Sequence, residues 1–274
     1  MFDVRLGDSE INDQRSTINN LDLSRYARQT SLKDFGVEGQ RSLLKGRVLV
    51  VGVGGLGSWA SELLVRAGVG FIRIVDNDSV ELGNIHRQAM YTESDASARR
   101  LKIDAAAEQL REINSNVEVD AVHARLDRLT AEKLMQDVDV VVDGTDNFET
   151  RFLLNDCAMK LSKPWVFAGV MGTQAQMMTI VPGRTPCLRC LMDAPPATES
   201  GPRAVLGPAV AVTSSFEATE AVKLLSGHSD RINPCLLVFD VWDNTIRQID
   251  VSPARADCPC CVHRRFEFLE PNPR

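Results

Sequence analysis

A run of β-branched residues stands directly before a glycine-rich turn in the stretch RVLVVGVGGLGS, which begins at residue 47. The turn contains four glycines, Gly52, Gly54, Gly55 and Gly57. Glycines at this spacing let the backbone of a strand, turn and helix approach a phosphate at the N-terminus of the helix. The stretch therefore predicts a parallel α/β sheet with a nucleotide site, although a tight turn without a ligand would need the same glycines.

Short apolar strands alternate with helices along the first part of the chain. Strand patterns occupy residues 71–76, 117–124, 138–146 and 164–170. Helical patterns occupy about 58–67, 98–113 and 149–161, with a short one after Thr130. This alternation predicts a doubly wound, Rossmann-like and mostly parallel sheet, whose ligands lie beyond the carboxyl ends of the strands.

The pattern changes after Gly172. Residues 174–183 alternate like a half-exposed antiparallel strand, and a crossing loop rich in proline and glycine occupies about 185–208. A helix at about 208–225 and a hairpin at 235–251 follow. We therefore expect antiparallel C-terminal strands beside the parallel sheet.

Length and charge limit the class of protein. The chain has 274 residues and a formal net charge of −6, which suits one large domain and does not favour nucleic acid as a partner. The polar residues 1–22 indicate an N-terminal arm, and residues 23–274 one domain. Acidic residues near the start and the lack of a long apolar segment predict a cytoplasmic protein with no membrane partner.

Asp76 ends the second predicted strand about twenty residues after the glycine turn, where a carboxylate can accept hydrogen bonds from both hydroxyls of a ribose. Capping of the next turn is the alternative for this carboxylate. The segment that follows, DNDSVELGNIHRQ, contains Asn84, Arg87 and Gln88. An arginine at this place suits a bidentate contact with phosphate.

Lys102 begins the next helix, and the turn GTDN at 144–147 follows a later strand. A triphosphate needs cations beside it and a carboxylate that holds magnesium. Arg87, Lys102 and Asp146 together therefore favour ATP over a dinucleotide. A solvated surface position is the alternative for Lys102.

Four of the seven cysteines form two CxxC pairs, Cys187 with Cys190 and Cys258 with Cys261. Their thiolates can form one closed tetrahedral zinc site, which would tie the crossing loop to a C-terminal segment at about 253–263. A redox motif is the alternative for either pair, and Cys260 could replace a neighbour as a ligand. Cys157 and Cys235 lie in apolar patterns and are expected in the core.

Eight features in this order resemble the ThiF/MoeB/HesA group of bacterial adenylyltransferases, which is related to the ubiquitin-activating enzymes. They are RYARQ at 25–29, GVGGLGS, DNDSVELGNIHRQ, Lys102, GTDNFETR, CLRC, SFEATEAVKLL and CPCC. The resemblance extends from about Leu23 to Val262. It implies an enzyme that binds ATP with Mg²⁺ and adenylates the C-terminal Gly-Gly carboxylate of a small ubiquitin-like sulfur-carrier protein, with release of pyrophosphate, in a pathway of the thiamine or molybdopterin type.

The resemblance also implies roles for the matched residues. The nucleotide site would comprise Gly52, Gly54, Gly55, Gly57, Asp76, Asp78, Asn84, Arg87, Gln88, Lys102, Asp146 and Asn147. Within it, Gly55 and Asp76 would hold the adenosine, and Asp146 the magnesium ion. Asn84, Arg87 and Lys102 would hold the phosphates.

The RYARQ motif implies a homodimer, because Arg28 would reach across a two-fold interface into the partner's triphosphate pocket. Arg28, Arg87, Lys102 and Asp146 would be the catalytic set. Their charges, with Mg²⁺, would stabilise the negative charge that develops on the attacked phosphate. Arg151 would help to orient the carrier's tail.

Several positions depart from the family pattern. Ser200 stands in the crossing loop where many relatives have a cysteine, which argues against thioester or acyl-disulfide transfer on this chain. Sulfur would then come from a separate donor of the cysteine desulfurase or rhodanese type. Gly83, His86 and Trp59 also differ from the residues usual in the family.

Three other functions fit parts of the sequence. The same adenylation chemistry could act on the C-terminus of a ribosomal peptide, although the arm at 1–22 is short for a dedicated peptide-binding domain. An NAD-dependent oxidoreductase needs only the glycine turn and Asp76. A catalytically silent scaffold of the same fold is the third, but it would not need the charged residues retained here.

Overall fold

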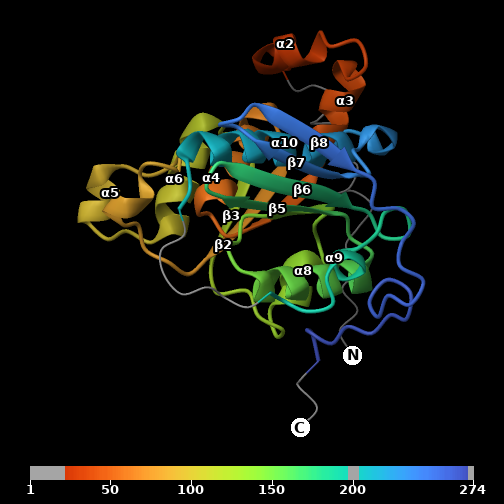
Figure 1. The fold of residues 1–274 in the computed structure, drawn as a ribbon. Coiled ribbons are helices and arrows are strands. Elements are labelled where there is room, and N and C mark those ends of the chain that lie inside the picture. The colour runs from red at the N-terminus through yellow and green to blue at the C-terminus, as the bar shows by residue number, and fades with distance from the viewer. Residues whose placement is uncertain (1–21, 197–203, 271–274) are drawn as a thin grey trace, which may run out of the picture.

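The computed structural model describes residues 22–196 and 204–270 (Figure 1). In this part of the chain eight strands form one sheet in the order β3-β2-β1-β4-β5-β6-β7-β8. The strands are β1 (Arg47–Val51), β2 (Phe71–Asp76), β3 (Glu118–His123), β4 (Val140–Asp143), β5 (Trp165–Met171), β6 (Gln174–Ile180), β7 (Leu236–Asp240) and β8 (Thr245–Ile249). β1 to β5 pair in parallel, and β5 to β8 pair antiparallel. The predicted α/β sheet, mostly parallel with antiparallel C-terminal strands, is confirmed.

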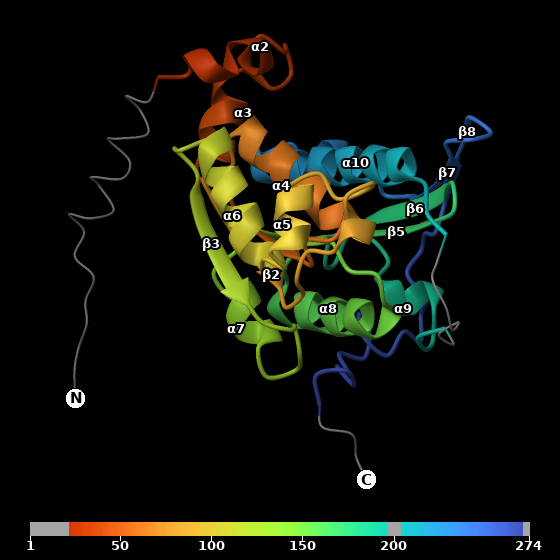
Figure 2. The ribbon, with the colours of Figure 1, turned by 90° about the vertical axis from the view of Figure 1, so that its left-hand side faces the viewer.

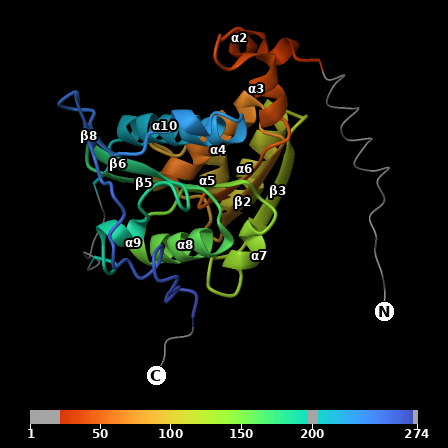
Figure 3. The same ribbon diagram turned by 90° about the vertical axis from the view of Figure 1, so that its right-hand side faces the viewer.

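Helices cover both faces of the sheet. The α-helices are α2 (Ala27–Thr30), α3 (Gly36–Leu43), α4 (Gly55–Ala67), α5 (Glu93–Ser97), α6 (Lys102–Ile113), α7 (Ala131–Met135), α8 (Phe148–Leu161), α9 (Leu188–Leu191) and α10 (Gly207–Leu225). Short 3₁₀ helices are η1 (Ser24–Tyr26), η2 (Leu82–Asn84) and η3 (Ser229–Arg231). Figure 2 shows α4, α6 and α10 above the sheet and α7, α8 and α9 below it. Figure 3 shows the C-terminal segment on the side of α8 and α9.

Alternate residues of β1 belong to different cores. Val48 and Val50 are fully buried against α4, α6 and α10, whereas Leu49 is fully buried on the side of α7 and α8. Successive side chains of a strand point to opposite faces of its sheet. A strand covered on both faces is therefore apolar at every position, as RVLVV is after its first residue.

Two helix boundaries differ from the sequence prediction. α4 begins at Gly55 instead of Ser58, with Gly54 as its N-cap, so Gly55 and Gly57 lie in the first turn of the helix. α6 begins at Lys102, as predicted for that residue, and not at about residue 98 where the amphipathic pattern starts, because Arg99 has a positive φ of 48° and Leu101 forms a β-bridge with Ser79. The short helix α5 and the helices before β1 were not predicted, since none has a long apolar period.

Residues 174–180 of the predicted segment 174–183 form an antiparallel strand, but the prediction that this strand is half-exposed was wrong. Met178 and Ile180 are buried on the side of α8, and Ala175 and Met177 are buried on the side of α10. β6 is thus an interior strand between β5 and β7. The hairpin was predicted correctly, with Asn244 at a positive φ of 54° in its turn, and every residue of the outer strand β8 is exposed.

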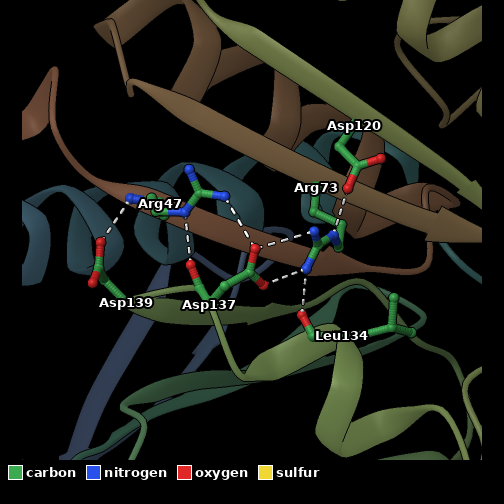
Figure 4. A network of polar contacts seen from close by, with 6 residues as sticks. All are labelled: Arg47, Arg73, Asp120, Leu134, Asp137 and Asp139. Carbon is green, nitrogen blue, oxygen red and sulfur yellow. Dashed lines mark hydrogen bonds and ion pairs between the residues drawn. The ribbon is translucent and has the colours of Figure 1, made fainter. Parts of the chain in front are cut away.

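A polar network fastens the amino ends of the parallel strands (Figure 4). Arg73 on β2 contacts Asp120 on β3 and Asp137 beyond α7, each at 2.6 Å, and Arg47 on β1 contacts Asp137 at 3.1 Å. The hydrogen bond from Arg73 holds the pKa of Asp137 below its usual range. Both guanidinium groups also lie over the ring of Phe71, at 3.7 and 5.3 Å from its centre. The carboxyl ends, where the ligands were expected, stay open at the opposite edge.

The described helices do not include one that is long and apolar enough to span a bilayer. The predicted N-terminal arm at 1–22, except for its last residue, and Ser200 of the crossing loop lie outside the described residues.

Candidate functional site

A cleft of about 770 Å³ lies at the carboxyl ends of the parallel strands. It contains most of the predicted nucleotide residues, namely Gly52, Gly54, Gly55, Asp76, Asp78, Asn84, Arg87, Gln88, Lys102, Asp146 and Asn147. Of the residues predicted for nucleotide binding or catalysis, Gly57 and Arg28 do not line it. The fold therefore brings residues that were predicted from several separate turns to one edge of the sheet.

The glycine turn packs against the turn that follows β4. A Cβ at Gly57 would lie 1.8 Å from the carbonyl oxygen of Gly52, and a Cβ at Gly144 would lie 2.0 Å from the same oxygen. Gly57 is thus required by the packing of the turn and does not face a ligand. Because α4 begins at Gly55, its first N–H groups lie at the cleft, as an anion site requires.

Asp76 joins the glycine turn to the next loop. Its Oδ2 accepts a hydrogen bond from the backbone N–H of Val53, and its Oδ1 accepts one from that of Asp78, both at 2.8 Å. The turn-capping alternative is therefore observed. It leaves each carboxylate oxygen a second lone pair for a hydroxyl donor in the cleft.

The segment after β2 brings polar side chains to the cleft. Arg87 Nη1 donates to the carbonyl oxygen of Gly83 at 2.8 Å and lies 2.9 Å from Nε2 of His86. Asn84 Oδ1 accepts the backbone N–H of Glu81 at 3.0 Å. Gln88 is buried, and its Oε1 has no hydrogen-bond partner among the described residues. A buried acceptor without a partner is costly, so this amide suits contact with a ligand.

Lys102 is buried, with 6% of its surface exposed, so the surface-lysine alternative was wrong. Its Nζ lies 2.9 Å from Oδ2 of Asp78, and its backbone N–H donates to the carbonyl oxygen of Asp78. A lysine is rarely buried unless it has a partner. The fold therefore holds this ammonium group in the cleft.

A buried ion pair shapes the turn after β4. Arg151 Nε donates to Oδ2 of Asp143 at 2.8 Å, and Arg151 Nη2 donates to the carbonyl oxygens of Thr145 and Ala168, each at 2.7 Å. Asp146 follows on this turn and is exposed at the cleft. Arg151 thus fixes the turn that carries Asp146. The resemblance had implied a contact of this arginine with the carrier's tail.

Asn147, the next residue of this turn, is the N-cap of α8, and its Oδ1 accepts the backbone N–H of Thr150 at 2.9 Å. Arg125 also lines the cleft and was not predicted. It lies two residues beyond β3, and the rule that directed attention to the other strand ends would have found it. The cleft is completed by apolar residues, among them Val205 and Val210, from the end of the crossing loop and from α10.

Arg28 lies on α2, away from this chain's own cleft. Its side chain is exposed, and α2 projects from the body of the protein beyond α3 (Figures 1 and 2). A role for Arg28 at a nucleotide would therefore require the cleft of another chain.

The two CxxC pairs meet, as predicted. The Sγ atoms of Cys187, Cys190, Cys258 and Cys261 all lie within 4.8 Å of one another. The distances Cys187–Cys258 and Cys190–Cys261 are 3.6 and 3.4 Å, close to the spacing of thiolates around a tetrahedral zinc ion. The hydrogen bond with Cys187, together with burial, raises the pKa of Cys190 to about 12, so a cation has to displace these protons when it binds. The cluster suits zinc in a closed, structural site.

Cys260 is not part of this group. Its Sγ accepts a hydrogen bond from Nδ2 of Asn155 at 3.3 Å, and Oδ1 of the same amide accepts the backbone N–H of Leu188 at 2.9 Å. Cys260 therefore packs beneath the cluster. Cys157 is fully buried, as predicted, whereas Cys235 is only partly buried.

Glu217 on α10 is a buried carboxyl group that the sequence did not reveal. It is fully buried, and neither of its oxygens has a hydrogen-bond partner among the described residues. Burial and the charge of Asp143 raise its pKa well above the usual range, and the charge of Arg151 opposes this only in part. Burial thus favours the protonated form of Glu217, which leaves the charges of Asp143 and Arg151 to balance each other.

The fold and the site together define a Rossmann-like protein with a cleft at the carboxyl ends of its parallel strands and a four-cysteine cluster that suits zinc. A family model described as "ThiF family" matches residues 26–260. The chain is 38% identical over 248 residues to the sulfur carrier protein ThiS adenylyltransferase of Bacillus subtilis, which covers 89% of this chain and 73% of that protein. It is 39% identical to the adenylyltransferase and sulfurtransferase MOCS3 of Culex quinquefasciatus, over 89% of this chain and 56% of that protein. The chain belongs to the ThiF family and is an adenylyltransferase of the ThiF type.

Solved structures agree on the fold. The crystal structure of Escherichia coli MccB with MccA-N7isoASN superposes with a TM-score of 0.77 at 22% identity, covering 89% of this chain and 76% of that one.

The chain spans only about half the length of the MOCS3 relatives it matches, 56% for the protein of Culex quinquefasciatus and 51% for one from Zea mays.

Single substitutions should distinguish the four predicted zinc ligands from the neighbouring cysteine, Cys260. We expect Cys258→Ala to lose the bound zinc and to lower the melting temperature, because three thiolates leave the site open and the crossing loop loses its tie. Cys260→Ala should keep one zinc per chain. Zinc content by elemental analysis checks both variants, and equal zinc loss in both would contradict the assignment of ligands.

Replacement of Glu217 should change how stability depends on pH. Its folded pKa is raised, so the native state binds more protons than the unfolded state at every pH between the usual carboxyl range and that raised value. Stability therefore falls as the pH rises through this window. Glu217→Gln has no proton to lose, so it should match the wild type near pH 4.5 and exceed it at pH 8, by about 1.4 kcal/mol for each unit of pKa displacement within this window.

Denaturant unfolding at both pH values provides the measurement. Glu220→Gln is the matched control, because Glu220 is paired: its Oε2 accepts hydrogen bonds from Thr179 Oγ1 at 2.7 Å and from the backbone N–H of Asn233 at 2.9 Å. This control should be less stable than the wild type at pH 8. A Glu217→Gln variant that is also less stable at pH 8 would show that Glu217 is ionised.

Proposed function

We propose that this chain adenylates the C-terminal Gly-Gly carboxylate of a small ubiquitin-like sulfur-carrier protein, with ATP and Mg²⁺ and with release of pyrophosphate. The observation that carries the proposal is the buried Lys102, which lies with Arg87 in a cleft at the N-terminus of α4. Two cations beside a helix N-terminus suit a chain of phosphates, whereas an NAD site does not require them. The ThiS adenylyltransferase of Bacillus subtilis, at 38% identity, supports a carrier protein as the substrate.

The nucleotide would lie along the cleft from β2 toward α6. Asp76 has lone pairs for the ribose hydroxyls, and Ala124 and Leu126 provide apolar contacts beside it. Arg87 and Lys102 would hold the phosphates. The first N–H groups of α4 would donate hydrogen bonds to the same oxygens. Oε1 of Gln88, an acceptor, would take a hydrogen bond from a donor of the nucleotide such as a ribose hydroxyl.

The reaction joins a carboxylate to the α-phosphate. An oxygen of the carrier's C-terminal carboxylate would form a bond to the α-phosphorus, and the bond from that phosphorus to the bridging oxygen of pyrophosphate would break. Negative charge grows on the phosphate oxygens in this step, and Lys102 and Arg87 would stabilise it from fixed positions. Asp146 would hold Mg²⁺, which supplies further positive charge at the phosphates.

The chain's own residues keep these charges in place. The pair of Arg151 with Asp143 fixes the turn on which Asp146 lies, and Asp78 fixes the ammonium group of Lys102. When ATP binds, Lys102 would turn part of its contact from Asp78 to the phosphates, and the carboxylate of Asp78 could then contact the magnesium ion. The carrier's tail would enter beside Val205 and Val210, where the crossing loop reaches the cleft.

We further propose a homodimer in which Arg28 serves the partner's cleft. The exposed position of Arg28, outside the cleft of its own chain, supports this arrangement. The acyl adenylate would pass to a separate sulfur donor in a pathway of the thiamine or molybdopterin type.

Exchange of labelled pyrophosphate into ATP tests the chemistry. We expect exchange only when a carrier protein that ends in Gly-Gly is added, and a loss of about 100-fold or more in Asp146→Ala, because the magnesium charge is removed. Asp230→Ala, an exposed carboxylate on η3, is the control and should keep full exchange. Exchange that requires a free peptide instead of the carrier would redirect the substrate assignment, and no exchange with either would refute the adenylation proposal.

A mixing experiment tests the role of Arg28. Arg28→Ala and Asp146→Ala should each be inactive alone, because each dimer then lacks one necessary charge at both sites. Dimers reassembled from both variants should recover about a quarter of the wild-type activity, since half of them are mixed and each has one complete site. An inactive mixture would show that Arg28 acts, if at all, within its own chain.

A further inference from the structure

Two consecutive residues of α4 hold the segment that carries Arg87. The indole Nε1 of Trp59 donates a hydrogen bond to the backbone carbonyl oxygen of Arg87 at 3.2 Å. Ser58 Oγ accepts the backbone N–H of Ala89 at 3.1 Å. Both contacts come from the helix whose N-terminus faces the cleft. The segment that provides the arginine is thus fastened to the helix at which the phosphates would bind.

The side chain of Arg87 is also held along its length. Its Cδ would lie 4.0 Å from a Cβ built on Gly55, so the stem passes over the first residue of α4. Its Nη1 contacts the carbonyl oxygen of Gly83 and Nε2 of His86. Nε and Nη2 take no part in these two contacts. The orientation of the guanidinium group therefore depends on where the backbone of residue 87 lies.

Trp59 is itself well anchored. It is half-buried and packs, with Val170, Val205 and Val241, against a buried apolar cluster between α10 and the antiparallel strands. On the other side of the segment, a Cβ at Gly207 would lie 2.5 Å from the carbonyl oxygen of His86. The segment is thus enclosed between α4 and the start of α10, and the indole N–H is the one side-chain donor that α4 directs to the backbone of Arg87 among the described residues.

We propose that Trp59 is a positioning residue for ATP: its indole N–H fixes the backbone of Arg87 and so sets the place where the guanidinium group meets the phosphates. The proposal rests on the proposed function for the identity of the ligand. Trp59 does not line the cleft, so it acts through Arg87. Loss of one neutral hydrogen bond predicts an effect of about three- to tenfold on nucleotide affinity.

Trp59→Phe removes the N–H and keeps an aromatic ring in the apolar cluster. We expect the KM for ATP in pyrophosphate exchange, and the Kd for ATP with Mg²⁺ by calorimetry, to rise about three- to tenfold. The KM for the carrier should stay close to that of the wild type, and the melting temperature should fall by no more than about 5 °C, the loss expected for one neutral hydrogen bond. Trp242→Phe is the matched control, because Trp242 is 72% exposed on the hairpin between β7 and β8, and its nucleotide affinity should not change.

A second pair of variants separates positioning from general packing. In the Arg87→Ala background, Trp59→Phe should cause no further loss of ATP affinity, because the group that it positions is absent. A wild-type Kd in Trp59→Phe, or an equal loss with and without Arg87, would overturn the proposal. If the wild type binds ATP and shows no exchange, the adenylation proposal fails, and the calorimetric comparison still decides the role of Trp59.

Discussion

The close backbone contact between two turns is the constraint on which the rest of the site depends. The carbonyl oxygen of Gly52 lies so near the Cα atoms of Gly57 and Gly144 that a side chain fits at neither position. This contact brings the turn after β1 against the turn after β4, which is possible because β1 pairs with β4 in the sheet. The N-terminus of α4 and the exposed Asp146 then face one cleft. A larger residue at either glycine would move the N-terminus of α4 away from Asp146.

Much of the fold followed from local chemistry in the sequence. Strands that are apolar on both faces, such as RVLVV after Arg47 and FIRIVD apart from Arg73 and Asp76, could be assigned because burial on both faces demands consecutive apolar residues. The cluster of Cys187, Cys190, Cys258 and Cys261 was predictable because each CxxC spacing already places two thiols side by side. The positions of the cleft residues on strand ends followed from the rule for parallel sheets.

The failures have physical causes as well. β6 alternates in polarity at its start, yet it is buried from Met177 to Ile180, because it lies between β5 and β7 with α8 on one face and α10 on the other. The burial of Lys102 depends on Asp78, a partner 24 residues away, and no local pattern shows that pairing. Glu217 lies in a helix where a charged residue normally indicates the solvent face. Cys261 was predicted correctly from its CxxC spacing with Cys258, and the alternative ligand Cys260 lies outside the four-cysteine group.

The three tryptophans occupy three different environments. Trp165 is fully buried in the core, Trp242 is largely exposed, and Trp59 lies half-buried beside the segment that carries Arg87. Emission from an indole depends on the polarity around it and on the hydrogen bond that its N–H makes. The protein thus contains its own optical reporter beside the segment that carries Arg87, with one indole in the core and one in solvent as internal references.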